Sequence, residues 1–133
     1  MSSTNTAKKT DSKVECIIPI LNVRNVPASI DYYVNVLGFK LDWGWNDPPD
    51  FAGISRGDYA IMLCENGQGH PGTWLWMGVE NADEFYEEYK ASGAIIRDEP
   101  INYPWAYELR VEDLDGHVLR IGSEPRGDES HNH

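Results

Sequence analysis

The pattern of apolar and polar positions along this chain repeats once. Residues 19–43 and residues 74–98 each contain an apolar run, a short amphipathic segment closed by glycine, and a second apolar run. The closing glycines, Gly38 and Gly93, lie 93 − 38 = 55 residues apart. Two copies are too few for a solenoid, so the repeat predicts a pair of modules that share one core and leave a cleft between them.

The first copy predicts one helix among four strands. The apolar run 15–23 has the length of a buried strand. A helix is expected over 27–37, because proline suits its first turn, glycine suits the position after its last turn, and four apolar residues recur at helical spacing. These four residues are Ile30, Tyr33, Val34 and Leu37. Further strands are expected over 39–45, 51–55 and 59–65, the last two joined as a hairpin through residues 56–58.

The second copy repeats this order after a glycine-rich linker over 65–72. Strands are expected over 74–79, 94–97, 106–111 and 118–121, with a helix over 82–92 and a tight turn at Asp115-Gly116. The chain therefore reads as βαβββ twice, which is the α+β fold class. We expect a single domain over 14–124, with modules of about 14–66 and 73–124, between a disordered arm over 1–13 and a flexible tail over 125–133.

Charge and composition narrow the partners. The 133 residues carry a formal net charge of −11, which argues against nucleic-acid binding because phosphate contacts require a basic face. No apolar run approaches the roughly 18 residues that span a bilayer, and the polar start of the chain does not resemble a signal peptide. Cys16 and Cys64 lie in apolar runs, which favours buried thiols in a reducing cytoplasm, with a bond between them as the alternative. We expect a cytoplasmic protein that binds neither nucleic acid nor membrane.

Two short motifs look like ligand loops but fit structural roles better. Gly67, Gly69 and Gly72 spell the G-x-G-x-x-G dinucleotide pattern, yet a strand-like run follows where a pyrophosphate requires a helix N-terminus. Residues 113–116 begin like a calcium loop but lack a glutamate at the twelfth loop position, so a hairpin turn is expected there. The chain has no G-x-S-x-G, C-x-x-C or H-E-x-x-H motif, and no nucleophile with its base is indicated.

The segments VPASIDYYVNVLGF in the first copy and YELRVEDLDGHVLRI in the second resemble the vicinal oxygen chelate superfamily. That superfamily includes glyoxalase I, extradiol dioxygenases, fosfomycin resistance enzymes and bleomycin resistance proteins. Four collinear segments, IPILNVRNV, DFAGISRGD, WLWMGVENADEFYEEY and YPWAYELRVEDLDGH, are most similar to the bleomycin resistance proteins, and the resemblance covers about residues 15–124. It implies tandem βαβββ modules and a homodimer, either side by side or with the N-terminal strand around Pro19 exchanged between chains.

The resemblance also implies where a metal would bind in enzymatic relatives. Those enzymes hold a divalent ion with four side chains, typically His, Glu or Gln, near the middle of the first and fourth strands of each module. The matching positions here are Ile18, Met62, Trp74 and Arg120. Isoleucine cannot ligate, indole only donates, thioether is a poor ligand for hard cations, and arginine brings a positive charge. We therefore expect no metal, no cofactor and no Lewis-acid catalysis, and a binding protein in place of an enzyme.

Aromatic residues supply the candidate ligand site. The chain has five tryptophans, which either fill the core or line a cleft. In bleomycin resistance proteins the positions that match Phe51, Trp76 and Trp105 line the drug site at a dimer interface. By this resemblance, the ligand-binding residues expected here are Trp43, Asp47, Phe51, Met62, Trp74, Trp76, Trp105 and Tyr107.

The expected function is sequestration of a cationic, glycopeptide-like antibiotic such as bleomycin in an aromatic, acidic cleft between two chains. Planar rings would stack on the indoles, and carboxylates would attract the cationic groups. Two alternatives remain open. One is a metal-dependent lyase, isomerase or dioxygenase of the glyoxalase type, and the other is a binder of an aromatic metabolite of unknown identity.

Overall fold

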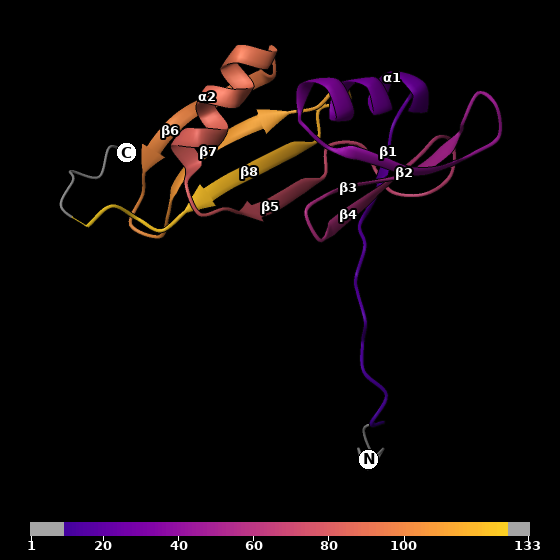
Figure 1. Ribbon diagram of the computed structural model, residues 1–133, viewed down its shortest axis with the longest axis horizontal. Coiled ribbons are helices and arrows are strands. Elements are labelled where there is room, and N and C mark those ends of the chain that lie inside the picture. Colours follow the sequence, from indigo (N-terminus) through magenta and orange to yellow (C-terminus); the bar gives the residue numbers. More distant parts are fainter. Residues whose placement is uncertain (1–9, 128–133) are drawn as a thin grey trace.

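The computed structural model describes residues 10–127 and contains the βαβββ pattern twice (Figure 1). The elements of the first module are β1 (Ile20–Asn22), α1 (Val26–Asp31), the π-helical turn η1 (Tyr32–Val36), β2 (Lys40–Trp45), β3 (Phe51–Arg56) and β4 (Tyr59–Cys64). Those of the second are β5 (Trp74–Gly78), α2 (Ala82–Ser92), β6 (Ile95–Asn102), β7 (Tyr107–Glu112) and β8 (Val118–Ser123). The predicted α+β fold of two tandem modules is confirmed. Of the predicted arm and tail, residues 1–9 and 128–133 lie outside the described part of the chain.

Each module folds into a four-stranded sheet of the same topology. The strand orders are β1-β4-β3-β2 and β5-β8-β7-β6, and in each sheet the first pair is parallel. Ile20 pairs with Met62 in the first sheet, as Trp76 pairs with Arg120 in the second. Both helices lie on the same side of the two sheets (Figure 1). Within residues 10–127, no helix therefore covers the opposite face of either sheet.

The core lies between the helices and the sheets. Tyr89 of α2 is fully buried and its hydroxyl donates to the Leu37 carbonyl at 2.8 Å, which ties the two modules together on the helical side. Apolar residues from the helix-facing positions of both sheets surround this contact. They include Leu21, Ile54, Leu63, Leu109, Val111, Leu119 and Ile121.

Both predicted α-helical starts are capped by asparagine. Asn25 and Asn81 each accept a hydrogen bond from a backbone N–H three residues further on, which satisfies one donor that the helix leaves free. The glycines that close the two amphipathic segments, Gly38 at φ +79° and Gly93 at φ +88°, occupy the left-handed region that other residues avoid. Among residues 10–127, no helix is long and apolar enough to cross a membrane.

The π-helical turn η1 replaces the end of the helix predicted over 27–37. The Leu37 N–H bonds back five residues to the Tyr32 carbonyl at 3.0 Å. Tyr32 and Tyr33 are both buried here, and their rings meet edge to face with centroids 6.2 Å apart. The wider turn thus places two consecutive aromatic side chains in the core, which regular helical spacing does not predict.

The turn between β7 and β8 joins the second module to the first. The hydroxyl of Tyr33 donates to the Asp113 carboxylate at 2.9 Å. His117 is fully buried, and its Nδ1 lies 2.9 Å from the Thr73 N–H while its Nε2 lies 2.6 Å from the Asn22 carbonyl oxygen. Both ring nitrogens of His117 therefore have a backbone partner, one of which lies in the first module. The acidic run that resembles a calcium loop is therefore the hairpin turn that the sequence predicts. This turn also joins the two modules by hydrogen bonds, which the sequence does not predict.

The first strand is shorter than the predicted 15–23. β1 pairs with β4 in a register that, continued toward the N-terminus, brings Ile17 opposite Tyr59, the first residue of β4. Residues before Ile17 therefore have no strand to pair with. Val14 and Ile17 are 79% and 88% exposed, and Cys16 is exposed and free, so the expectation of two buried thiols is wrong for Cys16. Cys64 is buried and also free, which removes the alternative of a bond between them.

β6 is longer than the predicted strand over 94–97, because it continues through Pro100 to Asn102. β6 is the edge of its sheet, where a residue without an N–H does not interrupt a ladder. Its register against β7 shifts on both sides of Asp98. A proline in the sequence usually indicates the end of a strand. Pro100 can lie within β6 because β6 is the edge strand of its sheet.

Candidate ligand-binding site

Side chains alternate across each sheet, so every second residue lies on the face opposite the helices. On the first sheet we call this face the first wall, formed by Trp43, Trp45, Phe51 and Met62. On the second sheet we call it the second wall, formed by Trp74, Trp76, Glu108, Arg110 and Arg120. Seven of the eight predicted site residues belong to a wall or border one, and Tyr107 does not.

The first wall is an aromatic cluster. The ring centroids of Trp43 and Phe51 are 5.5 Å apart, those of Trp43 and Trp45 are 6.0 Å apart, and Trp45 is 64% exposed. Gly53 faces Trp43 across the strands, and a Cβ on this glycine would overlap the indole. The glycine therefore lets the indole lie flat on the sheet. Met62 lies on the same face, paired with Gly53.

The predicted residue Asp47 lies in the loop between β2 and β3, beside the first wall. It is exposed, and the loop is closed by a hydrogen bond from the Asn46 amide to the Asp50 carboxylate at 2.8 Å. The loop returns directly to Phe51 of the wall. Carboxylates therefore border the first wall, and that of Asp47 is accessible to a cationic group of a ligand.

The second wall combines tryptophans with arginines. Trp74 and Trp76 share one face of β5 and are 48% and 52% exposed. The Arg120 guanidinium lies over the Trp76 ring at 5.2 Å from its centroid. The guanidinium groups of Arg97 and Arg110 lie over the Trp74 ring at 5.1 and 5.6 Å. The indoles are thus held in place by cation–π contacts and still expose much of their surface.

A buried carboxylate organises the second wall. The side chain of Glu108 is fully buried and accepts four hydrogen bonds: two from Arg120 at 2.8 and 3.0 Å, one from Arg110 at 3.2 Å, and one from the Trp105 indole N–H at 2.9 Å. Burial acts to raise the pKa of Glu108, but the donors from Arg120 and Trp105 outweigh it, so its pKa lies below the usual range. Glu108 is therefore a carboxylate that fixes its neighbours.

Trp105 lies beside this carboxylate at the entrance to β7. Its ring stacks on Tyr103 with centroids 4.6 Å apart and planes within 9° of parallel, and Trp105 is 58% exposed. Filling the core is thus not its role. The alternative that the tryptophans are core residues fails for Trp45, Trp74, Trp76 and Trp105, all of which are exposed.

Tyr107 does not reach the second wall, contrary to its predicted role. Its hydroxyl donates to Asp83 of α2 at 2.7 Å, and the Arg126 guanidinium lies 3.7 Å from its ring centroid. Strand alternation explains the difference, because Tyr107 shares the helix-facing side of β7 with buried Leu109 and Val111. The same alternation identifies Glu108 and Arg110, which the sequence analysis missed although they are charged residues inside an otherwise apolar strand.

The positions matched to the metal ligands of enzymatic relatives hold side chains that do not fit a metal. Ile18 precedes β1, whereas Met62, Trp74 and Arg120 lie on the walls. The carboxylate nearest to Arg120 is Glu108, and both of its oxygens already accept from arginine or indole donors. Within residues 10–127, no three His, Cys, Asp or Glu side chains are grouped so that they could hold an ion.

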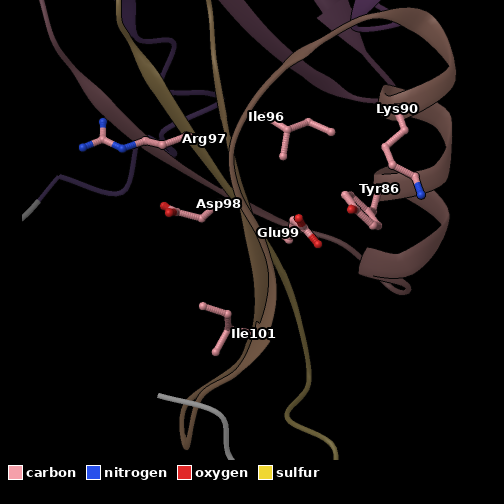
Figure 2. Close-up of a pocket in the computed structure, with 7 residues that line it drawn as sticks. All are labelled: Tyr86, Lys90, Ile96, Arg97, Asp98, Glu99 and Ile101. Carbon is pink, nitrogen blue, oxygen red and sulfur yellow. The ribbon is translucent and has the colours of Figure 1, made fainter.

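A cavity of about 500 Å³ lies at α2 and the edge strand β6. Figure 2 shows Ile96 and Glu99 on the helical side of β6, and Arg97 and Asp98 on the opposite side. The cavity is lined by Tyr86, Lys90, Ile96, Arg97, Asp98, Glu99 and Ile101. None of these is a predicted site residue, but Arg97 also lies over the Trp74 ring, so the cavity adjoins the second wall at β6.

The duplicated βαβββ fold with two uncovered sheet faces defines the class of this protein. The chain belongs to the glyoxalase/bleomycin resistance protein/dioxygenase superfamily, whose family model matches residues 15–121. Among curated proteins, none matches the chain.

Solved structures share the fold over nearly their whole length. The bleomycin-binding protein of bleomycin-producing Streptomyces verticillus, solved with copper(II)-bleomycin, is 26% identical, with a TM-score of 0.70 over 84% of this chain and 98% of its own. TioX from Micromonospora sp. ML1 is 23% identical, with a TM-score of 0.74 over 81% of this chain and 97% of its own. TnmS3, an antibiotic binding protein from Streptomyces sp. CB03234, is 19% identical, with a TM-score of 0.73 over 88% and 99%. At these identities, the last two establish the fold alone.

Proposed function

We propose that this protein binds a planar aromatic small molecule without transforming it, and that an antibiotic of the bleomycin type is the first candidate ligand. The observation that carries the proposal is the exposure of four tryptophans on or beside sheet faces that no helix covers. Large exposed aromatic surfaces are characteristic of interaction sites. Stacking a ring on an aromatic side chain contributes about 1–3 kcal/mol, so a few such contacts suffice for micromolar affinity, which is about 8 kcal/mol.

Binding is favoured over catalysis by the side chains at the four matched positions. Ile18, Met62, Trp74 and Arg120 offer no set of nitrogen or oxygen ligands for a divalent ion. The one fully buried carboxylate of the second wall, Glu108, is held in its ionised form by its donors and is poorly suited to accept a proton. We therefore propose a binding role in place of an enzymatic one.

The proposed site is completed by a second copy of the chain. Each wall is open in the single chain, and residues 10–19 extend away from the body on the side of the open faces (Figure 1). Val14 and Ile17 in this segment are 79% and 88% exposed apolar side chains, which supports a partner surface for the segment. A homodimer would bury the segment and set the first wall of one chain against the second wall of the other. The aromatic cleft with bordering carboxylates would then accept a planar ligand that carries cationic groups.

The structures with related folds support this choice of ligand class. The bleomycin-binding protein of S. verticillus was solved with copper(II)-bleomycin, and TnmS3 is described as an antibiotic binding protein. We infer a ligand of similar size and planarity here. A planar aromatic metabolite of another class would use the same two walls.

A fluorescence titration with metal-free bleomycin tests the proposal. We expect saturable quenching of tryptophan emission with a dissociation constant in the micromolar range or below, because the exposed indoles would stack on the planar rings of the drug. Trp76→Ala should weaken binding by about 1–3 kcal/mol, whereas Tyr107→Phe, on the helix-facing side, should leave it unchanged. Emission that does not change with bleomycin excludes this ligand.

The same samples test the composite site. Light scattering at micromolar concentration should give the mass of two chains, and the double substitution Val14→Asp, Ile17→Asp should shift it toward one chain, because both side chains are exposed in the single chain. Ligand affinity should fall together with the dimer. A monomer that binds bleomycin with full affinity would contradict the two-chain cleft.

A further inference from the structure

Two arginines lie directly opposite each other on the second wall. Arg110 of β7 and Arg120 of β8 are paired in register, and both project to the open face. Like charges in directly opposed positions destabilise a sheet. Glu108 offsets one of the two charges, because its buried carboxylate accepts hydrogen bonds from both guanidinium groups.

The two guanidinium groups use different numbers of their N–H donors in hydrogen bonds to Glu108. Arg120 uses Nε and Nη2 on Glu108, as a bidentate pair at 3.0 and 2.8 Å. Arg110 uses only Nε on Glu108, at 3.2 Å, and its Nη1 lies 3.8 Å from the Asp98 carboxylate, beyond hydrogen-bond distance. Arg110 therefore has donors left to recognise an acceptor beside the rings of Trp74 and Tyr103, over which its guanidinium lies.

This concentration of arginine contrasts with the charge of the chain. Three of the six arginines of the sequence, Arg97, Arg110 and Arg120, lie over the indoles of the second wall, although the net charge of the chain is −11. The first wall has no arginine among its members and is bordered by the acidic loop that contains Asp47. The two walls thus have different charge preferences within one acidic protein.

We propose that the second wall recognises an anionic edge of a planar ligand, such as an aromatic carboxylate or a phenolate, with Arg110 as the specificity-determining residue. The proposal rests on the proposed binding function and adds the chemistry of one end of the ligand. The ring stacks on the exposed indoles, and the acceptor oxygens take the terminal nitrogens of Arg110 in the planar, bidentate manner that guanidinium favours. Glu108 positions Arg110 and Arg120, because its hydrogen bonds fix the orientation of both groups.

Three probes with the same ring test this proposal by calorimetry: 2-naphthoate, 2-naphthalenemethanol and 2-naphthylmethylammonium. We expect 2-naphthoate to bind about fivefold to tenfold more tightly than the neutral alcohol, as one charge-assisted contact allows. Arg110→Gln should abolish this preference, so that the variant binds 2-naphthoate no more tightly than it binds the alcohol. Asp98→Asn should strengthen naphthoate binding, because it removes a carboxylate that competes for Arg110.

A matched control removes the same charge from the helical side of the module. Lys90→Gln should leave the preference for naphthoate intact, since Lys90 lies over Tyr86 on α2 and away from the second wall. Equal binding of the three probes, or a preference for the ammonium compound, overturns the inference and leaves the proposed function standing. Failure of all three probes to bind overturns both.

Discussion

The two walls occupy equivalent places in the duplicated fold and have different chemistry. In the first sheet, Met62 pairs with Ile20 and with Gly53, and in the second, Arg120 pairs with Trp76 and with Arg110. By the same equivalence, Phe51 of the first wall corresponds to Glu108 of the second. One wall is therefore built from apolar area and the other from directed, charged contacts.

One device is common to both walls. Trp43 lies over Gly53, and Trp76 lies over Gly122, with each glycine leaving room for the indole to lie on the sheet. Glycine inside a strand weakens it unless a neighbouring side chain covers the gap. The two pairs lie on different strands of the repeat, β2 with β3 in the first sheet and β5 with β8 in the second, so the same packing occurs at positions that are not equivalent.

The largest expected difference between the walls is in the response to loss of one central side chain. Arg120→Met should lower the free energy of unfolding by about 3 kcal/mol, because it leaves the fully buried Glu108 carboxylate with one arginine in place of two. The equivalent change on the first wall, Met62→Leu, should cost less than about 1.5 kcal/mol. Urea unfolding of both variants measures the difference. The double variant Glu108→Gln, Arg120→Met should recover much of the loss, and equal costs for the two single variants would contradict the contrast.

An intermediate effect is expected from filling the glycine positions. Gly53→Ala and Gly122→Ala should each lower the free energy of unfolding by about 1–3 kcal/mol, because the added Cβ overlaps an indole that must move. In a Trp76→Ala background, Gly122→Ala should be close to neutral, since the overlapping ring is gone. Denaturant midpoints of the single and double variants measure this coupling. If Gly122→Ala lowers the free energy of unfolding as much in the Trp76→Ala background as in the wild type, the overlap with the indole is not the cause of the loss.

The smallest expected effect is a dependence on pH that belongs to the second wall. The pKa of Glu108 is lower in the folded protein than in the unfolded chain, so its contribution to stability is present above the unfolded pKa of about 4.3 and is lost as the pH falls through the folded pKa. Glu108→Gln should therefore destabilise the protein at pH 7, and the gap to the wild type should narrow toward pH 3. Unfolding free energies of both proteins at the two pH values measure it. Phe51→Leu, at the equivalent position of the first wall, should give a gap that does not change with pH.

The sequence predicts most of the fold because its signals are local. The closing glycines, the capping asparagines and the apolar spacing define the elements. Trp76 and Trp105 are exposed, and their place at a ligand site stays a prediction. The N-terminal boundary of β1 could not be predicted, because it depends on where its partner strand β4 begins. The mostly apolar residues 14–19 resemble a strand in sequence even though they have no such partner. Tyr107 was assigned to the wrong face although Leu109 and Val111 define the buried side of β7. The roles of Glu108 and Arg110 depend on which strands are neighbours, which is information that only the sheet provides.

The hairpin turn between β7 and β8 has a consequence for the independence of the two halves. Asp113 and His117, both buried, take their partners Tyr33 and Asn22 from the other module. A half produced alone would lose these two hydrogen bonds, each of which contributes about 0.5–3 kcal/mol. The two modules repeat one plan, yet they are no longer interchangeable copies: each has become part of the folding environment of the other.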